Sequence, residues 1–312
     1  MLKFEVTILG CGSAMPTLRH YPSAQVVNVR DKLFMIDCGE GTQLQYRKAG
    51  LSFTRLYRIF ISHLHGDHCF GLPGFISTLE LLGRTAQLHV HAPKGLEEMV
   101  MPMLGQVGGD RSYEVVFHPF DTDKPAAIYD DRTVSVSTIP LDHRVPCCGF
   151  LFCEKARPSH IVREALDRYN IPISEIGRIK AGADYITPEG QFVSNDLLTT
   201  PADPPRRYAY VSDTTYLPRL AASLKGVDLL YHEATYAQTE QVMAEKYGHS
   251  TASQAAQLAH DAEVGQLLMG HFSDRYRDEN ILLDEARHIF PRTLLAKELT
   301  TFEVKPFATI SV

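Results

Sequence analysis

One stretch decides the fold of this chain: Ile59-Phe60-Ile61-Ser62-His63-Leu64-His65-Gly66-Asp67-His68. Its apolar start predicts the end of a buried β-strand, and four metal-capable side chains follow within six residues. Imidazole and carboxylate are ligands that suit zinc and its neighbours. Two ligand pairs so close together favour two ions in one site over a polar turn without metal, and a pair of ions indicates hydrolytic chemistry.

Three more metal-type side chains follow other predicted strands. His143 comes after a strand at 133–139, Asp213 after one at 208–212, and His271 after one at 266–269. Because strand-end loops are where αβ proteins commonly build their sites, we expect these side chains to meet the first cluster at one edge of a sheet. A lone histidine after a strand is more often structural, so the prediction depends on the whole set of seven: His63, His65, Asp67, His68, His143, Asp213 and His271.

The rest of the chain predicts a mixed α/β fold. Further short strands are expected at 5–9, 25–29, 33–37, 58–62, 88–92, 149–153 and 227–231, and helices at 72–82, 251–260 and 279–289. The turn Gly10-Cys11-Gly12-Ser13 follows the first strand. Met15 stands where a Rossmann motif has its third glycine, so a dinucleotide site is not indicated.

Composition sets wide bounds on the class of protein. A chain of 312 residues with 44% hydrophobic content can form one large domain or two ordinary ones. It has no apolar run long enough to span a membrane and no signal-peptide pattern, so we expect a cytoplasmic protein without a membrane partner. The six cysteines include no CxxC pair, which favours reduced thiols. A net charge of −6 argues, as a total, against a nucleic-acid partner.

Residues 155–183 interrupt the pattern with a polar, charged stretch that prolines and glycines punctuate. We expect an inserted arm there, within a single domain that spans 1–312. Between Lys155 and Lys180 six basic residues stand against three acidic ones, a local excess of +3. Such an excess fits RNA phosphate contacts, but it equally fits a solvated helix surface or a dimer contact. The candidate contacts are Arg163, Arg168, Arg178 and Lys180.

The HxHxDH run, with single downstream His, Asp and His ligands, is similar to the metallo-β-lactamase superfamily. Other segments resemble the ribonuclease Z family of tRNA 3′-processing endonucleases: Leu9 to Pro16, His232-Glu233-Ala234-Thr235, Gly248-His249-Ser250-Thr251 and His271-Phe272-Ser273-Asp274-Arg275-Tyr276. The resemblance implies an αββα four-layer sandwich with an inserted arm. It also implies removal of 3′ trailers from tRNA precursors, which leaves a 3′-hydroxyl on the tRNA and a 5′-phosphate on the trailer.

The resemblance further assigns roles to single residues. It implies two zinc ions, with Mn²⁺ or another divalent ion as alternatives, held in this way: one by His63, His65 and His143, the other by Asp67, His68 and His271, with Asp213 bridging them. A hydroxide bridging the ions would attack phosphorus in line, and Asp67 would accept the proton of the water. His249, supported by Glu233, is the candidate acid for the leaving ribose oxygen.

Two weaker expectations concern side chains beside the ligands. Asp37 in the Ile36-Asp37-Cys38-Gly39 turn is either a partner of the metal loop or an ordinary turn residue. Asp142, next to His143, is a possible partner of a ligand.

The resemblance also bears on the partners of this chain. Arms of this family clasp the tRNA body, often in the partner subunit of a homodimer, so the resemblance implies precursor tRNA and a second copy as partners. Residues 170–180 lack the Gly-Pro element that bacterial arms typically carry. The closest alternative function is another phosphodiesterase of the superfamily, such as one for cyclic nucleotides. Glyoxalase-like thioester hydrolysis and a non-catalytic RNA-binding module with a structural metal rank lower.

Overall fold

The structure, a computed structural model, describes residues 2–107 and 112–307. It divides into two compact units. The larger, which we call the main unit, comprises residues 2–154 and the chain from Arg206 onward. The smaller, the inserted unit, is Lys155–Pro205, and the arm expected at 155–183 falls within it.

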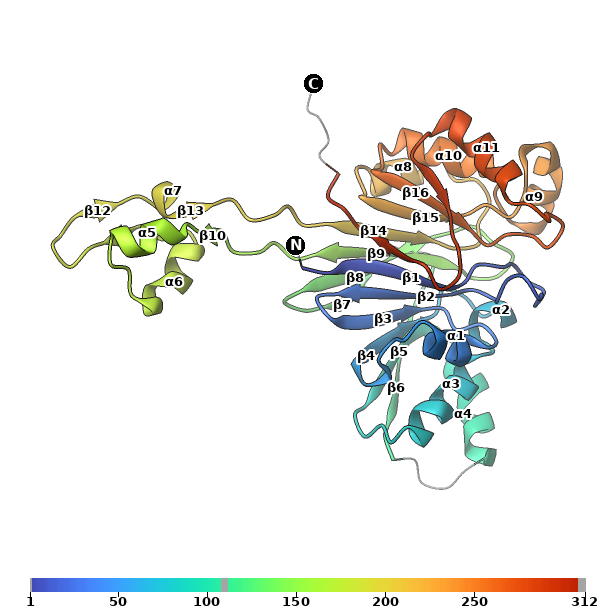
Figure 1. The fold of residues 1–312 in the computed structure, drawn as a ribbon. Coiled ribbons are helices and arrows are strands. Elements are labelled where there is room, and N and C mark those ends of the chain that lie inside the picture. The colour runs from blue at the N-terminus through green and yellow to red at the C-terminus, as the bar shows by residue number, and fades with distance from the viewer. Residues whose placement is uncertain (1, 108–111, 308–312) are drawn as a thin grey trace. The chain divides into compact units, whose positions relative to one another are not determined.

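Two seven-stranded sheets form the centre of the main unit (Figure 1). The first has the order β18-β1-β2-β3-β4-β5-β6, with β1 (Phe4–Gly10), β2 (Ala24–Val29), β3 (Lys32–Ile36), β4 (Leu56–Phe60), β5 (Leu88–Pro93), β6 (Val115–Phe120) and β18 (Thr301–Glu303). The second has the order β17-β16-β15-β14-β9-β8-β7, with β7 (Ala127–Asp130), β8 (Val134–Pro140), β9 (Cys148–Glu154), β14 (Arg207–Val211), β15 (Leu229–Glu233), β16 (Gln266–Gly270) and β17 (Thr293–Leu295).

Helices cover the outer face of each sheet. Those on the first sheet are α1 (Thr42–Lys48), α3 (Leu72–Leu81) and α4 (Leu96–Val107), with the short α2 (Gly66–Cys69) and the 3-10 turn η1 (Phe53–Arg55) in its loops. Those associated with the second are α8 (Leu220–Leu224), α9 (Gln241–Tyr247), α10 (Ala252–Asp261) and α11 (Asn280–Ile289), with the 3-10 turn η2 (Gln238–Glu240). This arrangement confirms the predicted αββα sandwich.

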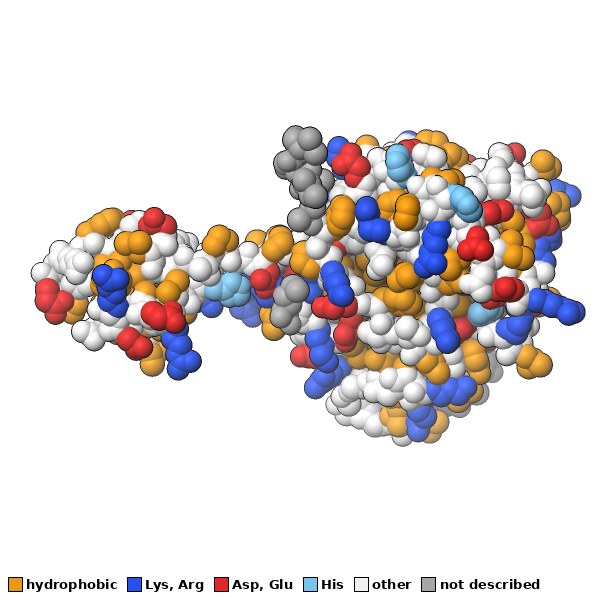
Figure 2. Space-filling model, turned by 45° about the horizontal axis from the view of Figure 1, so that its top comes forward, with side chains coloured by type: hydrophobic (Ala, Val, Ile, Leu, Met, Phe, Trp, Pro, Cys, Tyr) orange, Lys and Arg blue, Asp and Glu red, His pale blue; other side chains and the backbone are white. Residues whose placement is uncertain are grey.

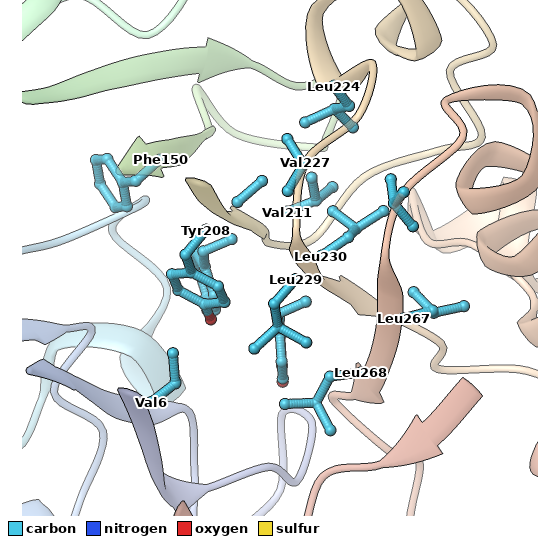
Figure 3. Close-up of a cluster of buried hydrophobic side chains, with 14 of the residues drawn as sticks. Val6, Phe150, Tyr208, Val211, Leu224, Val227, Leu229, Leu230, Leu267 and Leu268 are labelled. Atoms are coloured by element: carbon cyan, nitrogen blue, oxygen red, sulfur yellow. The ribbon is translucent and has the colours of Figure 1, made fainter. Parts of the chain in front are cut away.

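Apolar side chains fill the space between the two sheets. Phe4, Val6 and Ile8 alternate along β1 and join the same buried cluster as Phe150 and Tyr208 of the second sheet. Figure 3 shows Val6, Phe150 and Tyr208 within this cluster. Fully burying one such Val, Ile or Phe side chain contributes roughly 1.5–3 kcal/mol to the stability of the fold. The shared core therefore fixes the two sheets against each other, together with the loops that follow their strands.

The strands and helices predicted from periodicity are all present, with ends within about two residues of the expected ones. In the main unit, the elements that were not predicted are the strands β6, β7, β17 and β18, the helices α1, α2, α4, α8 and α9, and the 3-10 turns η1 and η2. Among the described residues, no helix combines the length and the apolarity needed to cross a membrane.

The inserted unit has its own small core. Its elements are β10 (His160–Ile161), α5 (Arg163–Arg168), α6 (Ile173–Lys180), β11 (Tyr185–Ile186), β12 (Phe192–Val193), α7 (Asn195–Leu198) and β13 (Thr199–Thr200). β13 pairs with β10, so residues beyond 183 belong to the unit. Six buried apolar side chains pack together: Ala165, Ile171, Ile179, Tyr185, Val193 and Leu198. Figure 2 shows exposed apolar side chains on this unit among both acidic and basic ones.

A buried ion pair in the main unit marks the point where the chain leaves for the inserted unit and returns. Arg206 Nε donates to Glu154 Oε2 at 3.0 Å, and both side chains are buried. The backbone N–H of Glu154 also donates to the carbonyl of Arg206 at 2.9 Å. The antiparallel register of β14 with β9 starts at the adjacent residues, where Arg207 lies opposite Cys153, so the two strands are paired up to the point where the inserted unit begins and ends.

Candidate active site

The seven predicted ligands meet at strand ends, but the strands belong to two sheets rather than one. Residues 63–68 follow β4 of the first sheet. His143, Asp213 and His271 follow β8, β14 and β16, which run in the same direction in the second sheet and end at the same edge. The expectation of one sheet edge was therefore wrong, because the sandwich brings the ends of both sheets together.

Four ligand atoms form a first group, which we call cage A. His63 Nε2 lies 3.1 Å from His65 Nδ1, and His65 Nδ1 lies 3.3 Å from His143 Nε2. Asp213 Oδ2 closes the group at 3.7 Å from His63 Nε2 and 3.8 Å from His143 Nε2. Cage A thus contains three imidazole nitrogens and one carboxylate oxygen.

The other oxygen of Asp213 belongs to a second group, cage B. Asp213 Oδ1 lies 3.4 Å from His68 Nε2 and 3.3 Å from His271 Nε2. Asp67 Oδ2 lies 3.6 Å from each of these two nitrogens. Asp213 is therefore the one ligand of the seven that offers an oxygen to both cages.

The two cages fit divalent cations. Ligand atoms bound at about 2.0–2.1 Å around a tetrahedral ion lie roughly 3.3–3.5 Å from one another, close to the spacings in both cages. Moreover, His68 Nε2 and His271 Nε2 are buried and lack a hydrogen-bond partner among the described residues. Buried polar atoms are rarely left unpaired, so a cation that both nitrogens could bind accounts for them.

Most of the histidine ligands have their tautomer fixed by a neighbouring acceptor. Each donates its Nδ1–H and so points the lone pair of Nε2 into a cage. The pairs are His63 with Ser62 Oγ (3.0 Å), His68 with Asp37 Oδ2 (2.7 Å), His143 with the Gly248 carbonyl (2.7 Å) and His271 with Thr235 Oγ1 (2.9 Å). Among the five histidine ligands, His65 is the one whose Nδ1, rather than Nε2, faces the cage.

Asp37 organises the metal loop from beneath. It is fully buried, and its φ of 58° places it in the left-handed region. Its Oδ1 accepts the Ser62 N–H at 2.7 Å, and its Oδ2 accepts from the Ser62 hydroxyl (2.9 Å), His68 Nδ1 (2.7 Å) and the Tyr210 hydroxyl (2.7 Å). Of the two readings of Asp37, this geometry favours the partner of the metal loop. Asp142 instead contacts Thr214 and Thr215 and touches no ligand.

His249 and Glu233 form a pair beside cage B. His249 Nδ1 donates to Glu233 Oε1 at 2.9 Å, and Glu233 also accepts from the Thr214 N–H and the Thr235 hydroxyl. Burial disfavours the charged imidazolium, but the charge of Glu233 and its hydrogen bond override this effect and raise the pKa of His249 to about 9. His249 is therefore a proton donor held in place by a buried carboxylate.

The charges of the cages also favour cations. Burial alone would raise the pKa values of Asp67 and Asp213, but the nearby His68 and His271 hold both pKa values below their usual range. In His63 burial, reinforced by the charge of His68, lowers the pKa. Without a metal, the carboxylates of Asp67 and Asp213 are thus ionised and His63 is neutral, as metal binding requires. In His68 burial lowers the pKa, but the charges of Asp213, Asp67 and Asp37 override this effect and raise the pKa well above its usual value, so a cation that binds there takes the place of a proton.

An open cavity of about 420 Å³ lies over the cages. His65, Asp67, His143, Asp213, His249 and His271 line its floor, together with side chains that the sequence did not single out: Arg144, Tyr236, Met243 and Tyr247. Sequence reasoning also missed the groups that orient the ligands, among them Ser62, Thr235 and the backbone N–H of Ala14, which donates to Asp67 Oδ2 at 2.7 Å. All three stand in segments quoted from the sequence, but nothing in their residue type or position indicated that they orient a ligand.

The predicted phosphate contacts lie apart, in the inserted unit. Arg163, Arg168 and Arg178 are exposed and Lys180 is half-buried. Arg178 pairs with Glu175 at 2.9 Å, and Arg168 lies over the ring of Tyr169. The whole unit contains six basic and seven acidic residues, so the excess at 155–180 is offset by acids further along.

Several known proteins are similar to this chain in sequence. It is 61% identical over 298 residues to "Ribonuclease Z" of Bacteroides thetaiotaomicron, a match that covers 96% of this chain and 94% of the relative. It is 60% identical over 298 residues to "Ribonuclease Z" of Bacteroides fragilis, with 96% and 98% covered. The profile of a family described as "Anti-Pycsar protein Apyc1" matches residues 4–139.

Solved structures show the same fold. Human tRNase Z, short form, aligns with a TM-score of 0.70 at 24% identity and covers 96% of this chain and 99% of its own. The metallo-β-lactamase fold protein YhfI from Bacillus subtilis aligns with a TM-score of 0.67 at 16% identity, with 96% and 99% covered. Given the near full-length identity to its bacterial relatives, the chain belongs to the ribonuclease Z family, hydrolytic endoribonucleases of the metallo-β-lactamase superfamily.

Proposed function

We propose that this chain cuts the 3′ trailer from precursor tRNA and uses two zinc ions to do so, with Mn²⁺ or another divalent ion as a possible substitute. The observation that carries the proposal is the pair of cages that share Asp213, with the His249–Glu233 pair beside them. A structural zinc site is closed and mononuclear, whereas these cages open into a cavity. A catalytic role is therefore favoured over a purely RNA-binding one.

The chemistry follows from the residues that surround the cages. Divalent ions bound there would make a water more acidic and would neutralise charge on the phosphate oxygens. Asp67 Oδ2 faces cage B and is fixed by the Ala14 N–H, which leaves Oδ1 able to accept the proton of the attacking water. Attack in line with the leaving group then requires a donor on the opposite side of the phosphorus.

His249 supplies that donor. Glu233 holds its Nδ1, so Nε2–H is the proton available to the cavity that His249 lines. Transfer of this proton to the leaving 3′-oxygen releases a tRNA with a 3′-hydroxyl and a trailer with a 5′-phosphate. Asp67 and His249 thus act as base and acid, and Glu233 keeps the acid protonated.

The proposal also covers how the protein recognises tRNA, its oligomeric state and its place in the cell. We assign tRNA body contacts to the inserted unit, with Arg163, Arg168, Arg178 and Lys180 as the candidate cations, in a homodimer in the cytoplasm. The exposed apolar side chains of the unit, Ile173, Ile186, Phe192 and Leu197, support a binding role, because a unit with so small a core has few apolar groups to spare for solvent.

The decisive experiment incubates the purified protein with a trailer-bearing precursor tRNA, a mature tRNA and a cyclic nucleotide, and maps the RNA ends. We expect one cut at the trailer junction with a 3′-hydroxyl on the tRNA, and about two metal ions per chain by elemental analysis. Hydrolysis of the cyclic nucleotide with the precursor left intact would establish the phosphodiesterase alternative instead.

A further inference from the structure

Arg144 follows the ligand His143 and lines the cavity over the cages. Its side chain is exposed, and among the described residues its guanidinium has neither a hydrogen bond nor an ion pair. A guanidinium stays charged at any physiological pH and presents a planar set of N–H donors that matches two phosphate oxygens. Arg144 is therefore an exposed cation on the wall of the cavity, available to a phosphate of a bound substrate.

The other arginine of the cavity differs in this respect. Arg275 also lines it, but its guanidinium is paired with Glu240 and lies 5.2 Å from the centre of the Tyr236 ring. Glu240 offsets its charge, and the pairing fixes its direction. The third charged wall residue, Asp274, is bound to Arg19. Within residues 2–107 and 112–307, Arg144 is thus the arginine of the cavity wall that has no carboxylate partner.

The residues around Arg144 indicate which end of the cleaved bond its guanidinium lies near. Gly248 has a φ of 75°, and a methyl group placed on it would lie 3.4 Å from Arg144 Cγ and 2.9 Å from His143 Nδ1. The stem of Arg144 thus runs beside Gly248 and its neighbour His249, whose ring centre lies 5.1 Å from that of His143. Arg144 stands on the side of the cavity that holds the proton donor for the leaving oxygen.

We infer that Arg144 binds the phosphate immediately 5′ of the cleaved bond, on the nucleotide whose 3′-oxygen leaves. This inference rests on the proposed function, because it uses His249 to define the leaving side. The cages act on the scissile phosphate, and Arg144 holds the next phosphate toward the tRNA. The site thereby selects substrates whose backbone continues on the 5′ side of the cut, and it aligns the leaving oxygen with His249.

A substrate with one neutral phosphate tests the contact. Precursor tRNAs are prepared with a single methylphosphonate, either directly 5′ of the cleaved bond or directly 3′ of the scissile phosphate. For the unaltered protein, the 5′ replacement should lower kcat/KM roughly 10-fold, the effect of one lost charged hydrogen-bond pair. The Arg144→Gln variant should show a similar loss on the natural substrate and no further loss from the 5′ replacement. The 3′ replacement should cost both proteins the same.

Two further variants keep the test interpretable. Arg132 precedes β8 at the end opposite Arg144, so Arg132→Gln makes the same charge change away from the cavity and should behave as the unaltered protein. Arg144→Lys keeps the charge but not the planar donors and should recover part of the activity. Thermal melting and metal content establish that each variant is folded and loaded.

The inference is overturned if Arg144→Gln remains as sensitive to the 5′ methylphosphonate as the unaltered protein, or if it cleaves the natural substrate normally. Failure of the proposed function has a different signature, because the unaltered protein would then leave every precursor tRNA uncut. In that case the same pair of replacements in an RNA that the protein does cut tests Arg144 independently.

Discussion

The main unit and the inserted unit hold their functional side chains under opposite constraints. In the main unit, Asp213 and Glu233 are buried, and nearly every ligand is oriented by a second group. In the inserted unit, three of the four candidate cations are exposed, and within the described residues only Arg178 has a carboxylate partner. From this comparison we expect catalysis to depend on single residues, whereas the proposed recognition of tRNA by the inserted unit should be spread over its surface.

The largest effect is expected at the cages. Replacing Asp67 by Asn removes both a cage B oxygen with full charge and the proposed proton acceptor, so kcat should fall roughly 10³-fold or more. Binding of precursor tRNA, followed by gel shift, should change little, because the side chain keeps its shape. Near-normal turnover in a metal-loaded Asp67→Asn protein would remove Asp67 from the proposed mechanism.

Removing the whole inserted unit should come next. The paired ends of β9 and β14 allow residues 155–205 to be replaced by Asn-Gly, a dipeptide suited to a two-residue hairpin loop. We expect kcat/KM for precursor tRNA to fall roughly 100-fold, while hydrolysis of bis(4-nitrophenyl) phosphate stays within about twofold. Equal losses on both substrates would mean that the unit supports the active site itself.

Asp37 binds no metal itself but holds the ligand His68, so its substitution tests whether metal binding depends on the groups that orient the ligands. Asp37→Asn weakens the acceptor of His68 Nδ1, and loss of such a partner typically lowers metal affinity 10–100-fold. Competition with a chelator measures this affinity. As a control for the same cluster, Tyr210→Phe removes one donor to Asp37 but leaves its charge, and should have a smaller effect. Unchanged affinity in Asp37→Asn would assign Asp37 to the turn alone.

The sequence predicted the metal ligands but not the groups that orient them. His63, Asp213 and His271 were found because residue type and position at a strand end together carry the signal. Ser62 and the Gly248 carbonyl could not be found, because a hydroxyl or a carbonyl acts only where the fold brings it to an imidazole. The position of Asp142 next to the ligand His143 suggested that it contacts a ligand, but its carboxylate accepts from the Thr215 hydroxyl instead.

The missed elements have similar causes. β7 exposes both of its end residues and lacks an apolar alternation, so periodicity could not reveal it. The helix α4 contains Pro102, which reads as a helix breaker. In the inserted unit, β13 pairs with β10 forty residues earlier, so the acidic residues that offset the basic stretch belong to the same unit although they lie beyond residue 183.

The pH profile probes the coupling between Glu233 and His249. A proton donor works below its pKa, so activity is lost as the pH rises through that value. With Glu233 present the pKa of His249 is raised to about 9; in Glu233→Gln it should fall toward its ordinary value. The alkaline limb of the kcat profile should therefore move to lower pH, with a loss of about 10-fold above neutrality. If the alkaline limb does not move in Glu233→Gln, His249 is not the proton donor.

The smallest effect is expected for single cations of the inserted unit. The side chain of Arg178 is 70% exposed and pairs with Glu175 one turn earlier, so Arg178→Ala should change stability by less than about 0.5 kcal/mol and kcat/KM for precursor tRNA by less than about threefold. Arg163→Ala, which breaks no ion pair, is the matched control and should behave alike. If either substitution reproduced the loss caused by removing the whole unit, recognition would depend on one residue, and the contrast between the two units would disappear.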